Sequence, residues 1–243
     1  MKGIEAIGLA KDYGERRALR PLDLAIEEGS TFALLGPNGA GKTTTVKLLS
    51  CLLRPSAGSA RILGRDAAAE TAAVKRLVGV SPQETAVAPR LSAMENLLLV
   101  AGAYGLGRAE SRRRAEELLA AMSLEDRARD RASSLSGGME RRLSIAMAMV
   151  ADPPVLFLDE PTLGLDPEAR RELWELIEGF AGTKTVLLTT HYLEEAERLA
   201  DRVGILVGGA LRALGTADQI KAEAGAPSLE EAYLALVKKE SKK

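Results

Sequence analysis

Residues 31–44 read TFALLGPNGAGKTT, an uncharged run followed by a glycine-rich turn that ends on a lysine and threonines. The uncharged run predicts a buried strand over Thr31–Leu35, and the residues after the turn predict a helix from about Lys42 to Leu53. Between them, Gly36–Thr43 matches the phosphate-loop pattern G-x-x-x-x-G-K-[ST] at every fixed position. Glycines allow backbone N–H groups to surround a phosphate chain, and the helix that follows adds its positive N-terminal end. The segment therefore predicts a nucleotide-phosphate site.

Each side chain of this loop has an expected task. Lys42 would reach the β- and γ-phosphates of ATP, and the Thr43 hydroxyl would bind Mg²⁺. A chance match in a glycine-rich turn is the competing interpretation, but the strand before and the helix after favour the functional one. The candidate ATP-binding residues here are Gly36, Pro37, Asn38, Gly39, Ala40, Gly41, Lys42, Thr43 and Thr44.

The composition is that of an ordinary folded protein. The 243 residues are 46% hydrophobic and 28% charged, with a net charge of −1, so no global field favours nucleic acid. One cysteine excludes an internal disulfide and fits a reducing compartment. The longest apolar run, Leu97–Leu106, is shorter than the roughly 20 residues that cross a bilayer. If the protein acts at a membrane, we expect another protein to hold it there.

Apolar runs alternate with helical patterns along the chain, which indicates an α/β domain with a mainly parallel sheet. Two earlier segments, Ile4–Leu9 and Leu22–Ile26, suggest an N-terminal antiparallel β-layer, and Gly208-Gly209 signals a hairpin. After Thr31–Leu35, the further strands are expected at Arg76–Ser81, Val155–Leu158, Thr185–Thr189 and Val203–Val207.

Between the strands expected at Arg76–Ser81 and Val155–Leu158, the pattern is wholly helical from about Leu91 to Val150. Ser92 and Glu95 form a capping box before an apolar stretch. We therefore expect a domain over residues 1–215 with a helical subdomain at about 88–150 inserted into its core. Residues 216–243 would form a short helical C-terminal tail.

A second candidate site lies where another strand ends. The sequence VLFLDE at 155–160 places Asp159 and Glu160 directly after four apolar residues. Asp159 would hold Mg²⁺, directly or through water, as the acidic partner of the phosphate loop. Glu160 would polarise the attacking water as general base. A helix cap or a solvated strand end is the alternative for this pair.

The five residues LSGGM at 135–139 resemble the signature segment of the ABC ATPase family, usually written LSGGQ, with Met139 in the last position. The segment precedes the Asp159-Glu160 strand by about twenty residues, as in the family. The resemblance covers about residues 4–236 and implies the P-loop NTPase (RecA-like) form of the α/β fold. In this family, Ser136, Gly137 and Gly138 contact the γ-phosphate of ATP held by the other subunit.

Other family elements follow in order, and their roles here are those that the resemblance implies. Asp166, in Gly-Leu-Asp, matches the loop that crosses the dimer interface, and it is also placed to cap the helix beginning at Pro167. Gln83 matches the glutamine that senses Mg²⁺ and the water. His191, the one histidine of the chain, matches the residue that aligns Glu160 with the water. Tyr13 matches the aromatic residue that stacks on adenine.

The resemblance implies an ATP-hydrolysing subunit of an ABC transporter that binds ATP and Mg²⁺. It would form a dimer with itself or with a related cassette, around two ATP molecules, beneath a separate membrane permease. It would then lie in the cytoplasm, peripheral on the inner face of the cell membrane. Met139 and the segment Pro227–Tyr233 resemble the drug and polysaccharide export branch. The alternative is a non-transport ABC ATPase that acts on ribosomes or DNA.

Overall fold

A computed structural model describes residues 1–240, with side chains as far as Lys238. The last three residues of the predicted tail, 241–243, lie outside the described part. Among the described residues, no helix combines the length and the apolar character needed to cross a bilayer.

The centre of the molecule is a six-stranded sheet in which five strands run parallel. The last strand pairs antiparallel with its neighbour through the hairpin at Gly208-Gly209. Parallel neighbours require crossover connections, which the intervening helices provide. The predicted mainly parallel core is confirmed. In spatial order, the strands are β10 (Ala210–Gly215), β9 (Arg202–Val207), β3 (Thr31–Leu35), β8 (Thr185–Thr190), β7 (Val155–Asp159) and β6 (Val78–Ser81).

A second, antiparallel sheet confirms the predicted N-terminal β-layer. It contains β1 (Lys2–Tyr13) and β2 (Arg16–Glu27), both longer than expected. It also contains β4 (Ala57–Ile62) and the short β5 (Arg65–Asp66), which the sequence did not predict. Only two of the six residues of β4 are buried, so its sequence lacks an apolar run.

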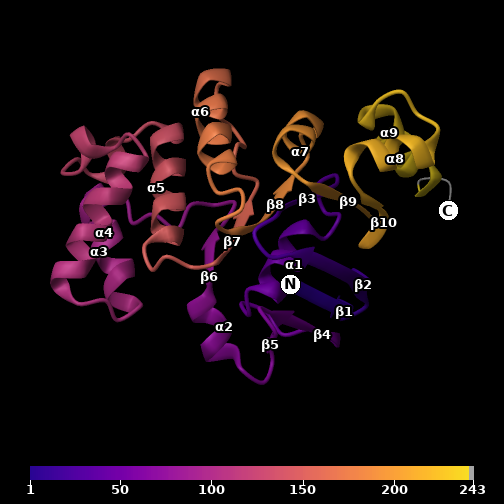
Figure 1. Cartoon of the computed structure of the whole chain (residues 1–243), viewed down its shortest axis with the longest axis horizontal. Helices are drawn as coiled ribbons and strands as arrows, with labels where there is room; N and C mark the ends of the chain where they lie inside the picture. Colours follow the sequence, from indigo (N-terminus) through magenta and orange to yellow (C-terminus); the bar gives the residue numbers. More distant parts are fainter. Residues whose placement is uncertain (241–243) are drawn as a thin grey trace.

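Nine α-helices occur in the described residues, and three of them lie together at one end of the molecule in Figure 1. These three helices, α3, α4 and α5, leave the sheet after β6, and the chain returns in the neighbouring strand β7. The last two helices lie at the opposite end (Figure 1). The bounds are α1 (Lys42–Leu49), α2 (Thr71–Leu77), α3 (Ala93–Ala103), α4 (Arg108–Ala121), α5 (Gly137–Met149), α6 (Pro167–Glu178), α7 (Leu193–Leu199), α8 (Ala217–Ala224) and α9 (Leu229–Glu240).

Helix ends show where the sequence pattern was wrong. Helix α1 ends at Leu49 rather than near Leu53, because Cys51 adopts a left-handed backbone conformation with φ +58°. The predicted strand at Arg76–Ser81 starts two residues too early, since α2 continues to Leu77. The predicted capping box is present: Ser92 Oγ accepts from Glu95 N at 3.1 Å.

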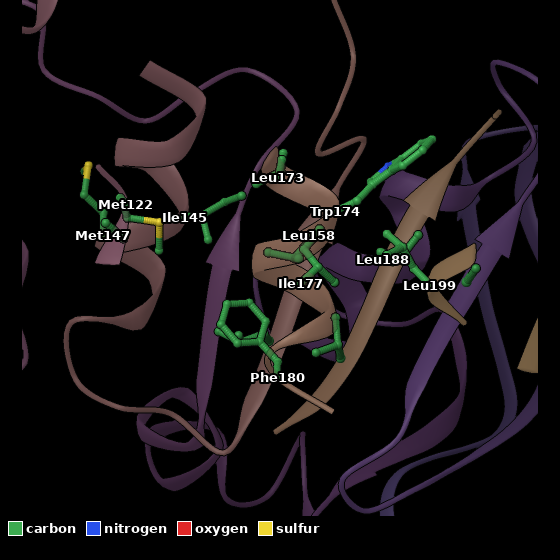
Figure 2. Packing of buried hydrophobic residues seen from close by; sticks show 14 of the residues in the cluster. Met122, Ile145, Met147, Leu158, Leu173, Trp174, Ile177, Phe180, Leu188 and Leu199 are labelled. Carbon is green, nitrogen blue, oxygen red and sulfur yellow. The ribbon is translucent and has the colours of Figure 1, made fainter. Parts of the chain in front are cut away.

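Two hydrophobic clusters cover the two faces of the parallel sheet. In β7, Val155 and Phe157 join the cluster beneath the antiparallel sheet, whereas Leu156 and Leu158 join the cluster beneath α5 and α6. This alternation follows from the two-residue period of a strand. Figure 2 shows the second cluster, with Leu158 and Leu188 of the sheet facing Ile177 and its neighbours on α6. Burial on both faces fixes the strand register, and thereby the position of each strand end.

Candidate ATP site

Three candidate segments meet because the strands before them end at one edge of the sheet. Leu35 of β3 is paired with Thr190 of β8, and Asp159 of β7 is paired with Thr189. Gly36 at the start of the phosphate loop, Glu160 and His191 are the next residues after the ends of β3, β7 and β8. Ligand sites in open α/β sheets lie at this carboxyl edge.

Close backbone contacts explain two glycines of the phosphate loop. A Cβ on Gly36 would lie 2.3 Å from Leu206 O, and one on Gly41 would lie 2.7 Å from Ala18 O. Gly41 also has φ +105° and precedes α1 without any side-chain cap on that helix. The first N–H groups of α1 therefore remain available to an anion.

Lys42 is buried beneath the loop and has three oxygen partners. Its Nζ donates to Gly36 O at 2.6 Å and to Pro37 O at 3.3 Å. It also lies 3.0 Å from Glu160 Oε1, and both side chains are almost fully buried. Removing one partner from such a buried pair costs about 3–5 kcal/mol, because the other charge is left uncompensated. The phosphate loop and the end of β7 are thus joined through their charged side chains.

Glu160 is held on its other side by the histidine. The second carboxylate oxygen, Oε2, lies 2.7 Å from His191 Nδ1. The backbone N–H of Glu160 donates to both O and Oγ1 of Thr189, at 3.1 and 3.0 Å. Its φ of +50° is unusual for a residue with a side chain. Backbone strain of this kind persists where surrounding contacts impose it, often at functional sites.

Asp159 lies deeper than Glu160, and its Oδ1 accepts from Thr189 Oγ1 at 2.5 Å. Among the described residues, no group of three or more His, Cys, Asp or Glu side chains could enclose a metal ion. The single carboxylate of Asp159 fits Mg²⁺, which takes one or two protein carboxylates together with phosphate and water oxygens. Asp159, Thr43 and Gln83 would supply the protein oxygens.

A cleft of about 290 Å³ lies beside Asp159, although Asp159, His191 and Gly36 are not among the residues that line it. It is lined by every residue from Pro37 to Thr44, by Gln83 and by Glu160. The lining also includes Arg16 and Ala18 at the start of β2, which the sequence analysis missed. Arg16 follows the two-residue turn after Tyr13, and no sequence pattern marks it as a residue of a ligand site.

Tyr13 lies beside this cleft but is not among the residues that line it. It pairs with Arg16 across the β1–β2 hairpin, the residue is 49% exposed, and Lys11 Nζ lies 5.3 Å from the ring centroid. Its stacking on adenine stays a prediction.

The four residues predicted to act in trans do not reach the cleft of their own chain. Ser136 caps α5 by accepting from Met139 N at 3.3 Å. Asp166 caps α6 as predicted, accepting from two backbone N–H groups at 3.0 Å, which lowers the pKa of its carboxyl. A Cβ on Gly138 would lie 3.2 Å from that of Ala169, so the starts of α5 and α6 are neighbours. Together with Gly137 they form a separate surface.

Two buried charged residues near the site were also missed by the sequence analysis. Arg141 lies on α5 and Glu195 on α7, and both are at most 4% exposed. Trp174 Nε1 donates to Glu195 Oε1 at 3.1 Å. Burial raises the pKa of Glu195 above its ordinary value of 4.5, although the polar side chains of Thr190, Thr162 and Trp174 act in the opposite direction. No local pattern marks either residue, because most of their partners lie about 20 or more residues away in the sequence.

Comparison with known proteins gives this arrangement a family. A family model described as "ABC transporter" matches residues 19–163. The chain belongs to the ABC transporter family. It is an ATP-binding cassette that hydrolyses ATP.

Named relatives of this ABC cassette agree with the assignment. It is 46% identical over 224 residues to a daunorubicin resistance ATP-binding protein of Streptomyces coeruleorubidus, covering 92% of this chain and 71% of that protein. It is 44% identical over 207 residues to a Nod factor export ATP-binding protein of Cupriavidus pinatubonensis, covering 85% and 64%. Neither name supports the alternative of a ribosome- or DNA-acting ATPase.

Solved structures show the same ABC cassette fold. The structure of an ATP-binding subunit of an ABC transporter superposes with a TM-score of 0.86 at 35% identity, covering 96% of this chain and 98% of that chain. The dimeric structure of a bacterial ABC transporter cassette gives 0.80 at 30% identity, covering 88% and 98%.

The buried carboxyl of Glu195 predicts a pH effect on the stability of this ABC cassette. A group whose pKa is raised on folding stabilises the protein below its unfolded pKa, and that contribution is lost as pH rises through its folded pKa. The melting temperature of Glu195→Gln, relative to the parent, should therefore increase over a pH range that extends upward from the ordinary carboxyl pKa of 4.5, by about 2–4 °C per kcal/mol.

Thermal unfolding followed by circular dichroism across this range measures the difference. Glu194→Gln, on the exposed neighbouring residue, is the matched control. A Glu195→Gln difference that stays constant or decreases with rising pH would contradict the assigned burial effect.

Proposed function

We propose that this cassette hydrolyses ATP as half of a head-to-tail dimer beneath a separate membrane permease, and that it powers export. One observation carries the dimer: Ser136, Gly137, Gly138 and Asp166 lie outside the Lys42–Glu160 cleft, on another surface of the chain. Groups that contact ATP from that surface must therefore belong to a second copy or to a related cassette. The dimeric structure of a similar cassette supports this arrangement.

In the proposed site, the loop residues from Gly36 to Thr44 bind the phosphates and Tyr13 stacks on the base. Mg²⁺, when bound, neutralises charge on the phosphate oxygens. Glu160 accepts a proton from the attacking water, and His191 orients the carboxylate from its Nδ1 side. Gln83, at the rim of the cleft, contacts the metal and the water.

The Lys42–Glu160 ion pair gives ATP a specific effect on the general base. A γ-phosphate that binds Lys42 Nζ competes with Glu160 Oε1, which lies 3.0 Å away. The carboxylate is then free to contact water while His191 still holds its other oxygen. Nucleotide binding would thus prepare the base as well as position the substrate.

The proposed direction of transport follows from the relatives. One is a daunorubicin resistance protein and another a Nod factor export protein by name. These names support export through a permease, which would keep the cassette at the inner face of the cell membrane. We propose that the permease, rather than this subunit, selects the transported compound.

A groove of about 460 Å³ between the sheet and the helical segment is a suitable surface for the permease. It is largely apolar, with Val100 and Tyr104 on one wall and Leu52 on the other. Pro82 and Ala86, on either side of Gln83 in the sequence, also line it. A helical segment of the permease that docks here would touch the loop that carries Gln83, and thereby influence the ATP site.

Replacing the general base should separate hydrolysis from binding. Glu160→Gln keeps the shape of the side chain but cannot accept the proton, so turnover should fall by about a hundredfold or more. Nucleotide binding should survive, since the phosphate loop is intact. ATPase kinetics and equilibrium binding of labelled ATP measure the two effects.

Lys42→Ala provides the contrast, because it removes the phosphate contact and should abolish binding. Turnover that is unchanged in Glu160→Gln would overturn the assignment of the base. Binding at parent affinity in Lys42→Ala would refute the proposed phosphate contact.

Affinity purification from native membranes in mild detergent tests the permease. We expect a polytopic membrane protein to co-purify, and Leu52→Asp to remove it while the ATPase activity of the isolated cassette persists. Leu52 is 59% exposed, so a charge there should not disturb folding. Ile7→Asp, at a 65% exposed position on β1, is the matched control.

Recovery of ribosomal proteins or nucleic acid without a membrane protein would contradict the transport proposal. Retention of the permease by Leu52→Asp would show that it docks elsewhere.

A further inference from the structure

One face of helix α5 is fastened to the segment that leads from β6 into the Gln83 loop. Ser144 Oγ and Ser81 Oγ are hydrogen-bonded at 2.9 Å. One turn earlier, Arg141 Nη1 donates to Pro82 O at 2.6 Å and to Gln83 O at 3.2 Å. The neighbouring Glu140 accepts a hydrogen bond from Thr85. Helix α5 therefore follows the backbone on both sides of Gln83.

Arg141 extends this attachment to the end of β7. Its Nε donates to Pro161 O at 2.9 Å, and its Nη2 donates to Glu160 O at 2.8 Å and to Asp159 O at 2.5 Å. Five backbone carbonyls from two segments of the chain thus accept hydrogen bonds from a single guanidinium, and Arg141 as a whole is 4% exposed. In the described structure, no other side chain is bonded to both the Gln83 loop and the Glu160 backbone.

The charge of Arg141 is balanced by nearby carboxylates rather than by a direct ion pair within the described residues. Burial lowers the pKa of the guanidinium, while Asp159, Glu195 and Glu160 favour its charged form. All its donors are directed to peptide oxygens. The planar guanidinium carries N–H groups along several edges, so it can donate to two separate backbone segments at the same time. A lysine ammonium has three donors on one atom and cannot span the same set.

We propose that Arg141 is a positioning residue that sets Gln83 and Glu160 relative to the start of α5. The inference rests on the proposed ATPase function and deepens it. Arg141 lies in the second turn of a helix whose first turn carries Gly137 and Gly138. In the proposed dimer, those glycines contact ATP bound to the partner, whereas Glu160 acts on ATP bound to its own chain. Arg141 therefore connects two groups of residues that act on different ATP molecules: the start of α5, which contacts the partner's ATP, and Glu160, which acts on the ATP of its own chain.

Arg141→Lys should lower kcat about 10-fold to 100-fold, the scale on which small misplacements of catalytic groups act. The dissociation constant for ADP should change less than about threefold, because the phosphate loop is untouched. Arg141→Gln should lower kcat further, since it removes the charge as well as the fork. Arg142→Lys is the matched control: its Nη1 pairs with Glu172 at 2.9 Å, a contact that a lysine can keep.

ATPase kinetics, ADP titration and melting temperature are measured on all four proteins. If the parent hydrolyses ATP and Arg141→Lys has the same kcat, the inference is overturned and the proposed function stays intact. An Arg141→Lys protein that does not fold, or that loses ADP affinity and kcat by the same factor, would also overturn the inference, because the role would then be purely structural. A parent protein that folds and does not hydrolyse ATP would contradict the proposed function instead.

Discussion

The buried ion pair between Lys42 and Glu160 is the contact on which the site depends. It connects the loop after β3 to the residue after β7, although these segments lie more than a hundred residues apart in sequence. The pair can exist because adjacent peptide and side-chain groups satisfy the remaining polar atoms of both partners. A buried pair with such support is expensive to break one side at a time. Only a ligand that replaces Glu160 at Lys42 can separate them cheaply, and a phosphate has the required charge.

The sheet makes this contact possible. The three strands that lead into the site, β3, β7 and β8, are buried along their whole length, so each has one allowed register and ends at a fixed position. Glu160 then adopts a positive φ that turns its side chain toward Lys42 and His191. The geometry of Glu160 and its partners thus follows from hydrophobic packing along the strands that precede them, part of which Figure 2 shows.

Local sequence patterns were sufficient for the central strands, the phosphate loop, the capping box at Ser92 and the helix cap at Asp166. They were insufficient where structure depends on distant partners. Strand β4 has few buried residues and is held by pairing with β1, so no apolar run predicted it. Arg141 binds backbone oxygens, which carry no sequence signal at all.

For the site, the loop from Pro37 to Thr44, Gln83 and Glu160 could be placed in one cleft from sequence, whereas Arg16 could not. The functional roles of these residues stay predictions. The residues at the starts of α5 and α6 acquire a role only with a second chain, so neither the sequence pattern nor a single fold can test them. The resemblance to the ABC family supplied that expectation, and the separate position of Gly138 beside Ala169 is compatible with it.

The central claim, that two chains complete each ATP site, is tested most directly by the mass of the Glu160→Gln protein in solution. Sedimentation equilibrium should give a dimer with Mg²⁺ and ATP, because the nucleotide is held and not hydrolysed, and a monomer with ADP. A protein that binds ATP and stays monomeric at concentrations well above those used for binding would contradict the composite site. The Lys42–Glu160 cleft would then have to function within a single chain.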